Sequence, residues 1–345
     1  MVENLCKELT LKAESWKDEI IETIYFGGGT PSLLAPAQIE KILASITQEY
    51  RLSKTLEITL EANPDDITRE YLTSIAYAGI NRISLGTQTF DDSRLKFINR
   101  AHSSQEALSA LELIKTSEIE NFSIDLIYAI PPDNMNYWVK DLDTALSFEP
   151  PHISLYGLTI EEQTVFGNWK KKGKIKEVDE GMASDQYRHA VHRLQKAGFE
   201  HYEVSNFAKP GFESRHNNGY WSGQPYLGIG PGAHSYHRNQ RMYNISNNAK
   251  YLKALENDEI PQSIESLSRI DQINESLFTG LRTSKGLNLT DLKRKFGVDL
   301  PVDYRELISD LTNRQLIIIN NGQLTLTSEG FMLADEITYR MFYEG

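Results

Sequence analysis

Five short apolar segments, separated by helix-like stretches, limit what this chain can fold into more than any other feature. The segments are residues 23–28, 56–63, 82–89, 122–130 and 152–159, and the stretches between them are 36–50, 66–79, 103–115 and 138–148. Turn residues or charges bound each apolar segment, as is typical of buried strands. Asp66 and either Ser103 or Ser104 are expected to be helix N-caps, and Gly79 a helix stop. Alternating strands and helices with short connections predict a parallel sheet, open or closed into a barrel.

Polar residues gather where these strands end. Gly27–Thr30 follow the first segment, Glu61 and Asn63 close the second, and Gln88 closes the third. Asp125 differs because it lies inside its apolar segment, where a carboxylate without a partner is costly. Ligands of parallel α/β sheets bind at the carboxyl ends of the strands. The sequence therefore predicts a site at this edge of the sheet.

The glycine run at 27–29 narrows the class of ligand. Consecutive glycines leave the backbone bare, so that a ligand can approach its N–H and C=O groups. A phosphate or the amino-acid end of a nucleoside cofactor fits such a loop, and a tight turn without a ligand is the plain alternative. Residue types and spacing leave these interpretations open.

The second half of the chain has a different pattern. Residues 161–260 contain a basic turn, a helix near 183–198, a strand-like segment at 201–208 and a Gly- and aromatic-rich region at 216–237. Residues 265–345 are helical and end in two β-rich runs joined by Asn-Gly, which is a strong hairpin signal. Helices followed by a hairpin predict a winged-helix-like domain.

Charge and composition exclude several classes of protein. The net charge is −12, and residues 265–345 carry 9 Lys and Arg against 12 Asp and Glu, so we expect no nucleic-acid partner. No run approaches the roughly 18 apolar residues of a membrane helix, and the N-terminus does not resemble a secretory signal. The expected location is the cytoplasm. Cys6 is the single cysteine, which excludes an internal disulfide.

Six segments together resemble a known family. They are YFGGGTPSLL, EANPDDIT, GINRISLGTQTFDD, SIDLIYAIP, HISLYGLT and HNNGYW. In this order they resemble the radical SAM proteins around oxygen-independent coproporphyrinogen III oxidase, and most closely the HemW branch of heme chaperones. The resemblance implies an α/β fold in three parts. Residues 1–160 would form a partial (β/α) barrel of the radical SAM type without its first strand, 161–260 a small α+β barrel extension, and 265–345 the winged-helix-like domain.

The resemblance also implies a site for S-adenosylmethionine (SAM). Gly28, Gly29 and Thr30 would receive its methionyl end, and Glu61 and Arg100 would complement its ammonium and carboxylate charges. Gln88 and Asp125 match positions that contact the ribose or nearby groups, and a ribose diol suits a carboxylate. The plain alternatives are that Glu61 caps the next helix and that Arg100 is an ordinary surface residue.

HNNGYW matches the HNxxYW pattern of the HemW branch, with His216, Tyr220 and Trp221 in place. The resemblance implies heme binding, with His216 as the axial iron ligand and the aromatic rings packed on the porphyrin. The alternative is a local hydrogen bond for His216, with Tyr220 and Trp221 filling a core. His234 is a second candidate ligand, in a segment that looks more like a loop closing over the SAM site.

The chain departs from the family at its defining motif. CxxxCxxC, whose thiolates hold a [4Fe–4S] cluster, is absent, and Cys6 lies in a segment that resembles the helix after the cluster loop. We therefore expect the cluster only in a longer form, and no radical chemistry from the chain as written. Either the N-terminus is truncated or the fold is kept for binding alone. Truncation is favoured, because Met1 falls partway through a family-like helix.

Three functional hypotheses follow. The first is a heme-binding chaperone that delivers heme to an acceptor protein, such as a membrane-associated respiratory protein. The second is oxygen-independent coproporphyrinogen III oxidase, which removes two propionate carboxylates as carbon dioxide through a SAM-derived radical. The third is a barrel enzyme that binds a phosphorylated metabolite at Gly27–Thr30. The HNxxYW motif favours the chaperone. The sequence carries no prediction of the oligomeric state.

Overall fold

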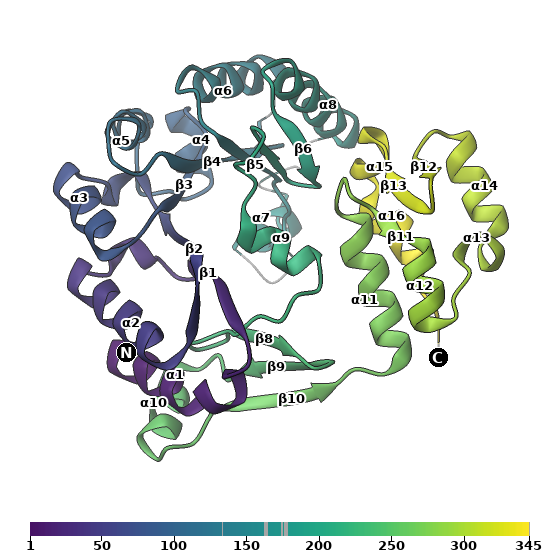
Figure 1. Cartoon of the computed structure of the whole chain (residues 1–345). Helices are drawn as coiled ribbons and strands as arrows, with labels where there is room; N and C mark the ends of the chain where they lie inside the picture. Colours follow the sequence, from purple (N-terminus) through teal and green to yellow (C-terminus); the bar gives the residue numbers. More distant parts are fainter. Residues whose placement is uncertain (133, 162–164, 174, 176–178, 345) are drawn as a thin grey trace. The chain divides into compact units, whose positions relative to one another are not determined.

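The computed structural model of the chain describes residues 1–132, 134–161, 165–173, 175 and 179–344 (Figure 1). The chain divides into two compact units. Unit 1 comprises Met1–Tyr25, Leu34–Ile58 and Ser214–Gly345, and unit 2 comprises Phe26–Leu33 and Thr59–Glu213.

The main sheet has seven strands in the order β1-β2-β3-β4-β5-β7-β6. They are β1 (Ile20–Phe26), β2 (Arg51–Ala62), β3 (Arg82–Gln88), β4 (Asn121–Tyr128), β5 (His152–Gly157), β6 (Glu200–Glu203) and β7 (Asn206–Ala208). Neighbours from β2 to β5 run parallel, whereas β7 is antiparallel to both β5 and β6. The predicted parallel sheet is thus confirmed. The single strand expected at 201–208 is wrong, because this segment turns back on itself as two short strands.

The longer helices of unit 2 lie along the outer side of β3, β4 and β5 (Figure 1). Unit 2 contains the short 3₁₀ helices η1 (Pro31–Leu33) and η2 (Pro64–Asp66), and the helices α3 (Arg69–Ala78), α4 (Asp92–Phe97), α5 (Ser104–Lys115), α6 (Met135–Ser147), α7 (Val165–Lys171) and α8 (Glu180–Lys196). Ser103 caps α5 in a capping box with Glu106, and Gly79 ends α3 at φ 111°, as predicted.

The predicted cap at Asp66 is wrong. Pro64 starts the 3₁₀ helix η2, and Ile67 after it is extended, at φ −87° and ψ 114°. Helix α3 can begin only beyond this extended residue, so Thr68 becomes the N-cap, and its hydroxyl accepts a hydrogen bond from the Tyr71 amide.

The parallel strands alternate between apolar and polar side chains. Leu60 lies opposite Ile83, and Leu85, Ile124 and Ile153 lie opposite one another; all five are completely buried. The opposite face of these strands is polar, with a row of register partners formed by Glu61, Ser84, Ser123 and His152. Parallel strands are usually apolar on both faces, so a polar face needs a separate explanation.

The first elements of unit 1 that do not belong to the main sheet are α1 (Val2–Trp16) and α2 (Pro36–Glu49). It continues with α9 (Arg215–Trp221), the strands β8 (His234–His237), β9 (Gln240–Asn244) and β10 (Gln262–Ser266), and α10 (Asn248–Glu256). β9 lies between β8 and β10 in an antiparallel sheet.

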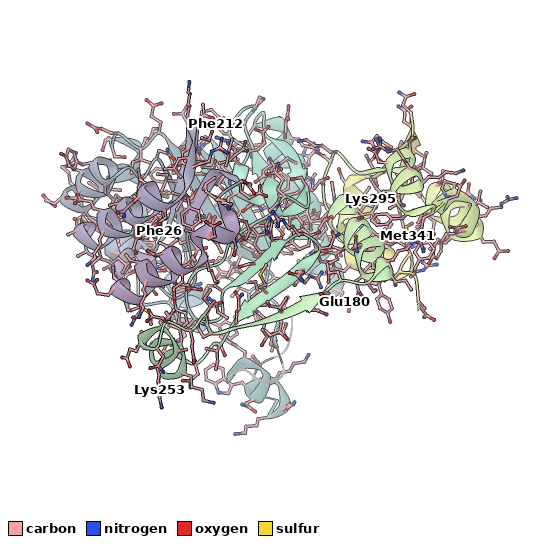
Figure 2. All side chains as sticks on the ribbon, turned by 60° about the horizontal axis from the view of Figure 1, so that its bottom comes forward. Phe26, Glu180, Phe212, Lys253, Lys295 and Met341 are labelled. Carbon is pink, nitrogen blue, oxygen red and sulfur yellow. The ribbon has the colours of Figure 1, made fainter. Side chains whose placement is uncertain are left out.

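The C-terminal part of unit 1 is a helical region with a small sheet. Its elements are α11 (Arg269–Leu281), β11 (Leu287–Asn288), α12 (Leu289–Phe296), α13 (Leu300–Asp303), α14 (Arg305–Asn313), β12 (Ile317–Asn320), β13 (Gln323–Leu326), α15 (Ser328–Met332) and α16 (Ala334–Tyr339). Asn321 and Gly322 both have positive φ between β12 and β13, which confirms the predicted hairpin. Met341, labelled in Figure 2, is completely buried here. No helix among the described residues is long and apolar enough to cross a membrane.

A buried ion pair fixes α1 within unit 1. Glu8 and Lys12, one helical turn apart, are 0% and 4% exposed, and Lys12 Nζ lies 2.6 Å from Glu8 Oε1. Glu8 also accepts hydrogen bonds from the Gly230 amide at 2.8 Å, the Asn244 side chain at 2.6 Å and the Tyr251 hydroxyl at 2.5 Å. The charge of Glu8 is therefore satisfied by groups from β9, α10 and the loop before β8.

We expect Glu8→Ala to lower the free energy of unfolding by about 3–5 kcal/mol, because it leaves the Lys12 ammonium buried without a counter-charge. Urea unfolding measures the change. Glu14→Ala is the matched control, since it removes the exposed partner of Lys17 on the same helix and should leave the midpoint nearly unchanged. Equal losses in the two variants would contradict a special role for the buried pair.

Candidate functional site

The loop after β1 has the backbone conformation that only glycine adopts without strain. Gly28 and Gly29 have φ of 71° and 68°, are exposed, and have no atom within 4 Å of where a Cβ would stand. The Gly28 amide donates a hydrogen bond to Glu61 Oε2 at 3.3 Å. The structure thus brings the glycine loop and Glu61 together within unit 2, with Thr30 directly after the glycines.

Gln88 lies in a strained backbone conformation at the end of β3. Its φ is 67°, in the left-handed region, and the register between β3 and β4 shifts between Leu85 and Gln88. Gln88 is 7% exposed, and its side-chain nitrogen lies 3.0 Å from where a Cβ on Gly86 would stand. Bulges and left-handed non-glycine residues are enriched at functional sites, where they re-aim a side chain.

Asp125 on β4 is held by hydroxyl groups. Ser84 and Ser123 each donate to its carboxylate at 2.8 Å, one to each oxygen. Burial raises the pKa of the Asp125 carboxyl, although hydrogen bonds from Ser154, Ser123 and Ser84 and the charge of Arg82 act in the opposite direction. Asp125 is half-buried by solvent accessibility, whereas Ser123 and Ser154 beside it are buried.

Arg100 lies close enough to Asp125 for their charges to interact. Desolvation lowers the pKa of the Arg100 guanidinium, whereas the carboxylates of Asp125 and Asp65 raise it. Unit 2 therefore contains Glu61 at the glycine loop, and Asp125 with Arg100 in electrostatic range of it. These are the charges that a zwitterionic nucleoside such as SAM requires.

Sequence reasoning missed the residues behind Asp125, which are Ser84, Ser123, His152 and Ser154. The available signal was the alternation of apolar and polar residues in RISLG, SID and HIS, which places a polar face on strands that are otherwise apolar.

His216 is anchored at the start of α9. The backbone amides of Arg215 and His216 donate to the two carboxylate oxygens of Glu57, at 3.2 and 3.1 Å. The imidazole stacks on Tyr25, with ring centroids 4.6 Å apart, and its Nδ1 lies 2.9 Å from the Thr23 hydroxyl. Residues of β1 and β2 in unit 1 thus fix both the backbone and the ring of His216.

The other two motif residues have different neighbours. The Tyr220 hydroxyl lies 3.2 Å from His216 Nε2, and Tyr220 is 39% exposed. Burial of its ring, followed by the neighbouring Tyr226, raises the pKa of Tyr220. Trp221 packs instead against Phe278 and under the Arg282 guanidinium, which lies 5.5 Å from the indole centroid. The motif therefore offers an exposed Tyr220 beside His216, and a Trp221 directed to the C-terminal region.

The second candidate, His234, is exposed on β8, with its ring 6.0 Å from that of Tyr243. Among the described residues, no three His, Cys, Asp or Glu side chains are grouped to hold a metal ion. Cys6 is a free cysteine. The residues of this chain therefore do not fit a thiolate-ligated [4Fe–4S] cluster.

Comparison with known proteins identifies the family. The model of the radical SAM superfamily matches residues 3–145, and the model of the HemN C-terminal domain matches residues 267–333. The heme chaperone HemW of Lactococcus lactis subsp. lactis (strain IL1403) is 38% identical over 336 residues, covering 97% of this chain and 87% of the relative. The chain belongs to the HemW family. HemW of Bacillus subtilis (strain 168) is 33% identical and covers 92% of this chain and 84% of its own length.

Membership of the HemW family confirms the resemblance seen in the sequence. Coproporphyrinogen III oxidase (HemN) from Escherichia coli has a similar solved structure, with a TM-score of 0.83, 20% identity, and coverage of 99% of this chain and 82% of the oxidase chain. At this identity the likeness shows the fold alone. The predicted partial barrel of the radical SAM type is confirmed. The oxidase is related to this chain in fold. The assigned SAM and heme residues stay predictions.

In this HemW-family chain, Glu57→Gln should loosen the start of α9, because an amide side chain can accept only one of the two backbone hydrogen bonds. We expect the Arg215 and His216 amides to exchange with solvent about tenfold faster, as the loss of one charge-assisted hydrogen bond implies. Hydrogen–deuterium exchange measures this. Glu22→Gln is the control, since the ion pair of Glu22 is with the Arg215 side chain, at 3.5 Å. Unchanged exchange in Glu57→Gln would contradict the anchoring role.

Proposed function

We propose that this chain binds heme at α9 through His216 and passes it to an acceptor protein, such as a membrane-associated respiratory protein. The observation that carries the proposal is the support of His216 by Thr23, Tyr25 and Glu57, next to an exposed Tyr220. The names of the HemW relatives, which describe heme chaperones, support the same function.

The contacts of His216 suit an axial heme ligand. If Nδ1–H donates to the Thr23 hydroxyl, the Nε2 lone pair accepts the hydroxyl proton of Tyr220. This tautomer leaves Nε2 ready to bind iron once Tyr220 moves aside, and the hydrogen bond at Nδ1 fixes the orientation of the ring. The exposed ring of Tyr220 can then pack on the porphyrin face.

We also propose that unit 2 holds SAM. Gly28, Gly29 and Thr30 would receive the methionyl end, beside Glu61 for its ammonium group and Arg100 for its carboxylate. Gln88 and Asp125 would contact the ribose. The open space at the two glycines and the half-buried Asp125 support this assignment. For SAM we propose binding alone, because the described residues do not supply ligands for a [4Fe–4S] cluster.

Heme titration tests the principal proposal. We expect wild-type protein to bind heme stoichiometrically, and His216→Ala to bind at least tenfold more weakly with a changed Soret band, since the iron loses its protein ligand. His234→Ala is the matched control, an exposed histidine on β8 that should leave the titration unchanged. If His234→Ala alone loses heme affinity, the axial ligand is His234 and not His216.

Tyr220→Phe should have the opposite effect to His216→Ala. The Tyr220 hydroxyl competes with iron for Nε2, at 3.2 Å, and phenylalanine keeps the ring without the hydroxyl. Because one hydrogen bond has a net value of about 0.5–1.5 kcal/mol, we expect heme affinity to rise by about 2- to 10-fold. The same absorption titration measures it. A weaker affinity would show that the hydroxyl contacts heme rather than blocks Nε2.

A further inference from the structure

A chain of hydrogen bonds lies behind the carboxylate of Asp125 in unit 2. Ser123 Oγ is 2.8 Å from Asp125 Oδ1 and also 2.8 Å from His152 Nδ1. On the far side of the imidazole, His152 Nε2 lies 2.8 Å from the Tyr202 hydroxyl. Ser123 and His152 are completely buried, whereas Asp125 is half-buried. Asp125 is therefore the end of the chain that a ligand can meet.

Strand register places these groups in contact. Ser123 of β4 lies opposite His152 of β5, and Asp125 lies opposite Ser154, on the same face of the sheet. Ser154 Oγ completes the cluster at 3.0 Å from Ser123 Oγ. No residue of this cluster lies on a loop, so its geometry is set by the sheet itself.

Counting protons fixes the direction of each hydrogen bond. An ionised Asp125 can only accept, so the single hydroxyl proton of Ser123 points to Asp125. Ser123 must then accept from His152, which requires the proton on Nδ1. With Nδ1 protonated and the ring neutral, Nε2 accepts from the Tyr202 hydroxyl. One tautomer of His152 satisfies the whole chain from Tyr202 to Asp125.

The surroundings keep His152 neutral. Burial lowers the pKa of the His152 imidazole well below its usual range, and the nearby positive charge of Arg82 acts in the same direction. A neutral imidazole with fixed donor and acceptor sides holds the Ser123 hydroxyl in one orientation. Ser123 and Ser84 each donate to one oxygen of Asp125, and Ser154 also interacts with the carboxylate, which has about four acceptor sites and so keeps capacity for a ligand.

We propose that His152 and Ser123 are positioning residues that hold the Asp125 carboxylate as a paired acceptor for the two adjacent hydroxyls of a ribose. The inference rests on the proposed nucleoside site of unit 2 and adds residues that do not touch the ligand. Two carboxylate oxygens match a cis-diol, and a fixed carboxylate discriminates against sugars that lack these hydroxyls.

Two substitutions of His152 test the roles of its two ring nitrogens separately. His152→Asn places an amide nitrogen near the position of Nδ1, so the donor to Ser123 is kept and the contact with Tyr202 is lost. His152→Gln places an amide near the position of Nε2, so the contact with Tyr202 is kept and the donor to Ser123 is lost. Calorimetric titration uses S-adenosylhomocysteine and its 2′,3′-dideoxyribose analogue as probes.

We expect wild-type protein to prefer S-adenosylhomocysteine over the dideoxy analogue by about tenfold or more, as for one to two hydrogen bonds to a charged group. His152→Gln and Ser123→Ala should lose most of this preference, whereas His152→Asn should retain it. The dideoxy analogue should bind all variants alike. Ser123→Ala supplies the same test with a smaller change, should His152→Gln fail to fold by circular dichroism.

The outcomes separate the two proposals. If wild-type protein binds neither probe, the nucleoside site and this inference are both wrong. If wild-type protein binds S-adenosylhomocysteine with the expected preference, but His152→Gln and Ser123→Ala keep it, only the positioning role is wrong. Equal weakening of both probes would likewise overturn it, since that result indicates a structural role alone.

Discussion

Buried charge is the constraint on which each unit of this chain depends. An ionised side chain removed from water needs a counter-charge or several hydrogen bonds, which apolar packing cannot supply. In unit 1, Glu8 obtains both, from Lys12 and from polar groups as far away in sequence as Asn244. In unit 2, Asp125 obtains hydroxyl groups, and its pKa remains raised. The first arrangement supplies a counter-charge, whereas the second supplies hydroxyl groups alone at short range, which is why we propose Asp125 as part of the nucleoside site.

Helix geometry explains why the three motif residues of α9 have different contacts. His216 and Tyr220 are four residues apart and lie on the same side of the helix, whereas Trp221 is turned about 100° away from Tyr220. His216 consequently contacts Thr23 and Tyr25, while Trp221 meets Arg282 at the end of α11. The HNxxYW motif thus connects a candidate ligand to the helical C-terminal region within unit 1.

Local signals made much of the fold predictable from sequence. The N-cap of α5, predicted at Ser103 or Ser104, and the Asn321–Gly322 hairpin both depend on residues a few positions apart. The cap at Asp66 was mispredicted, because the 3₁₀ turn at Pro64 displaces the helix start. Ser123 and His152 could not be assigned, because their contact depends on the register between β4 and β5, which no local pattern specifies.

Two features of unit 2 oppose stability and support a binding role. Gln88 adopts a left-handed conformation that disfavours a non-glycine residue by about 1–2 kcal/mol. Asp125 has a higher pKa folded than unfolded, so the folded chain binds more protons, and stability falls as pH rises from about 3.9 through the raised value. Glycine at position 88 and an apolar residue at position 125 would avoid these penalties. Such penalties persist where a site requires them, and both lie at the sheet edge where a ligand would bind.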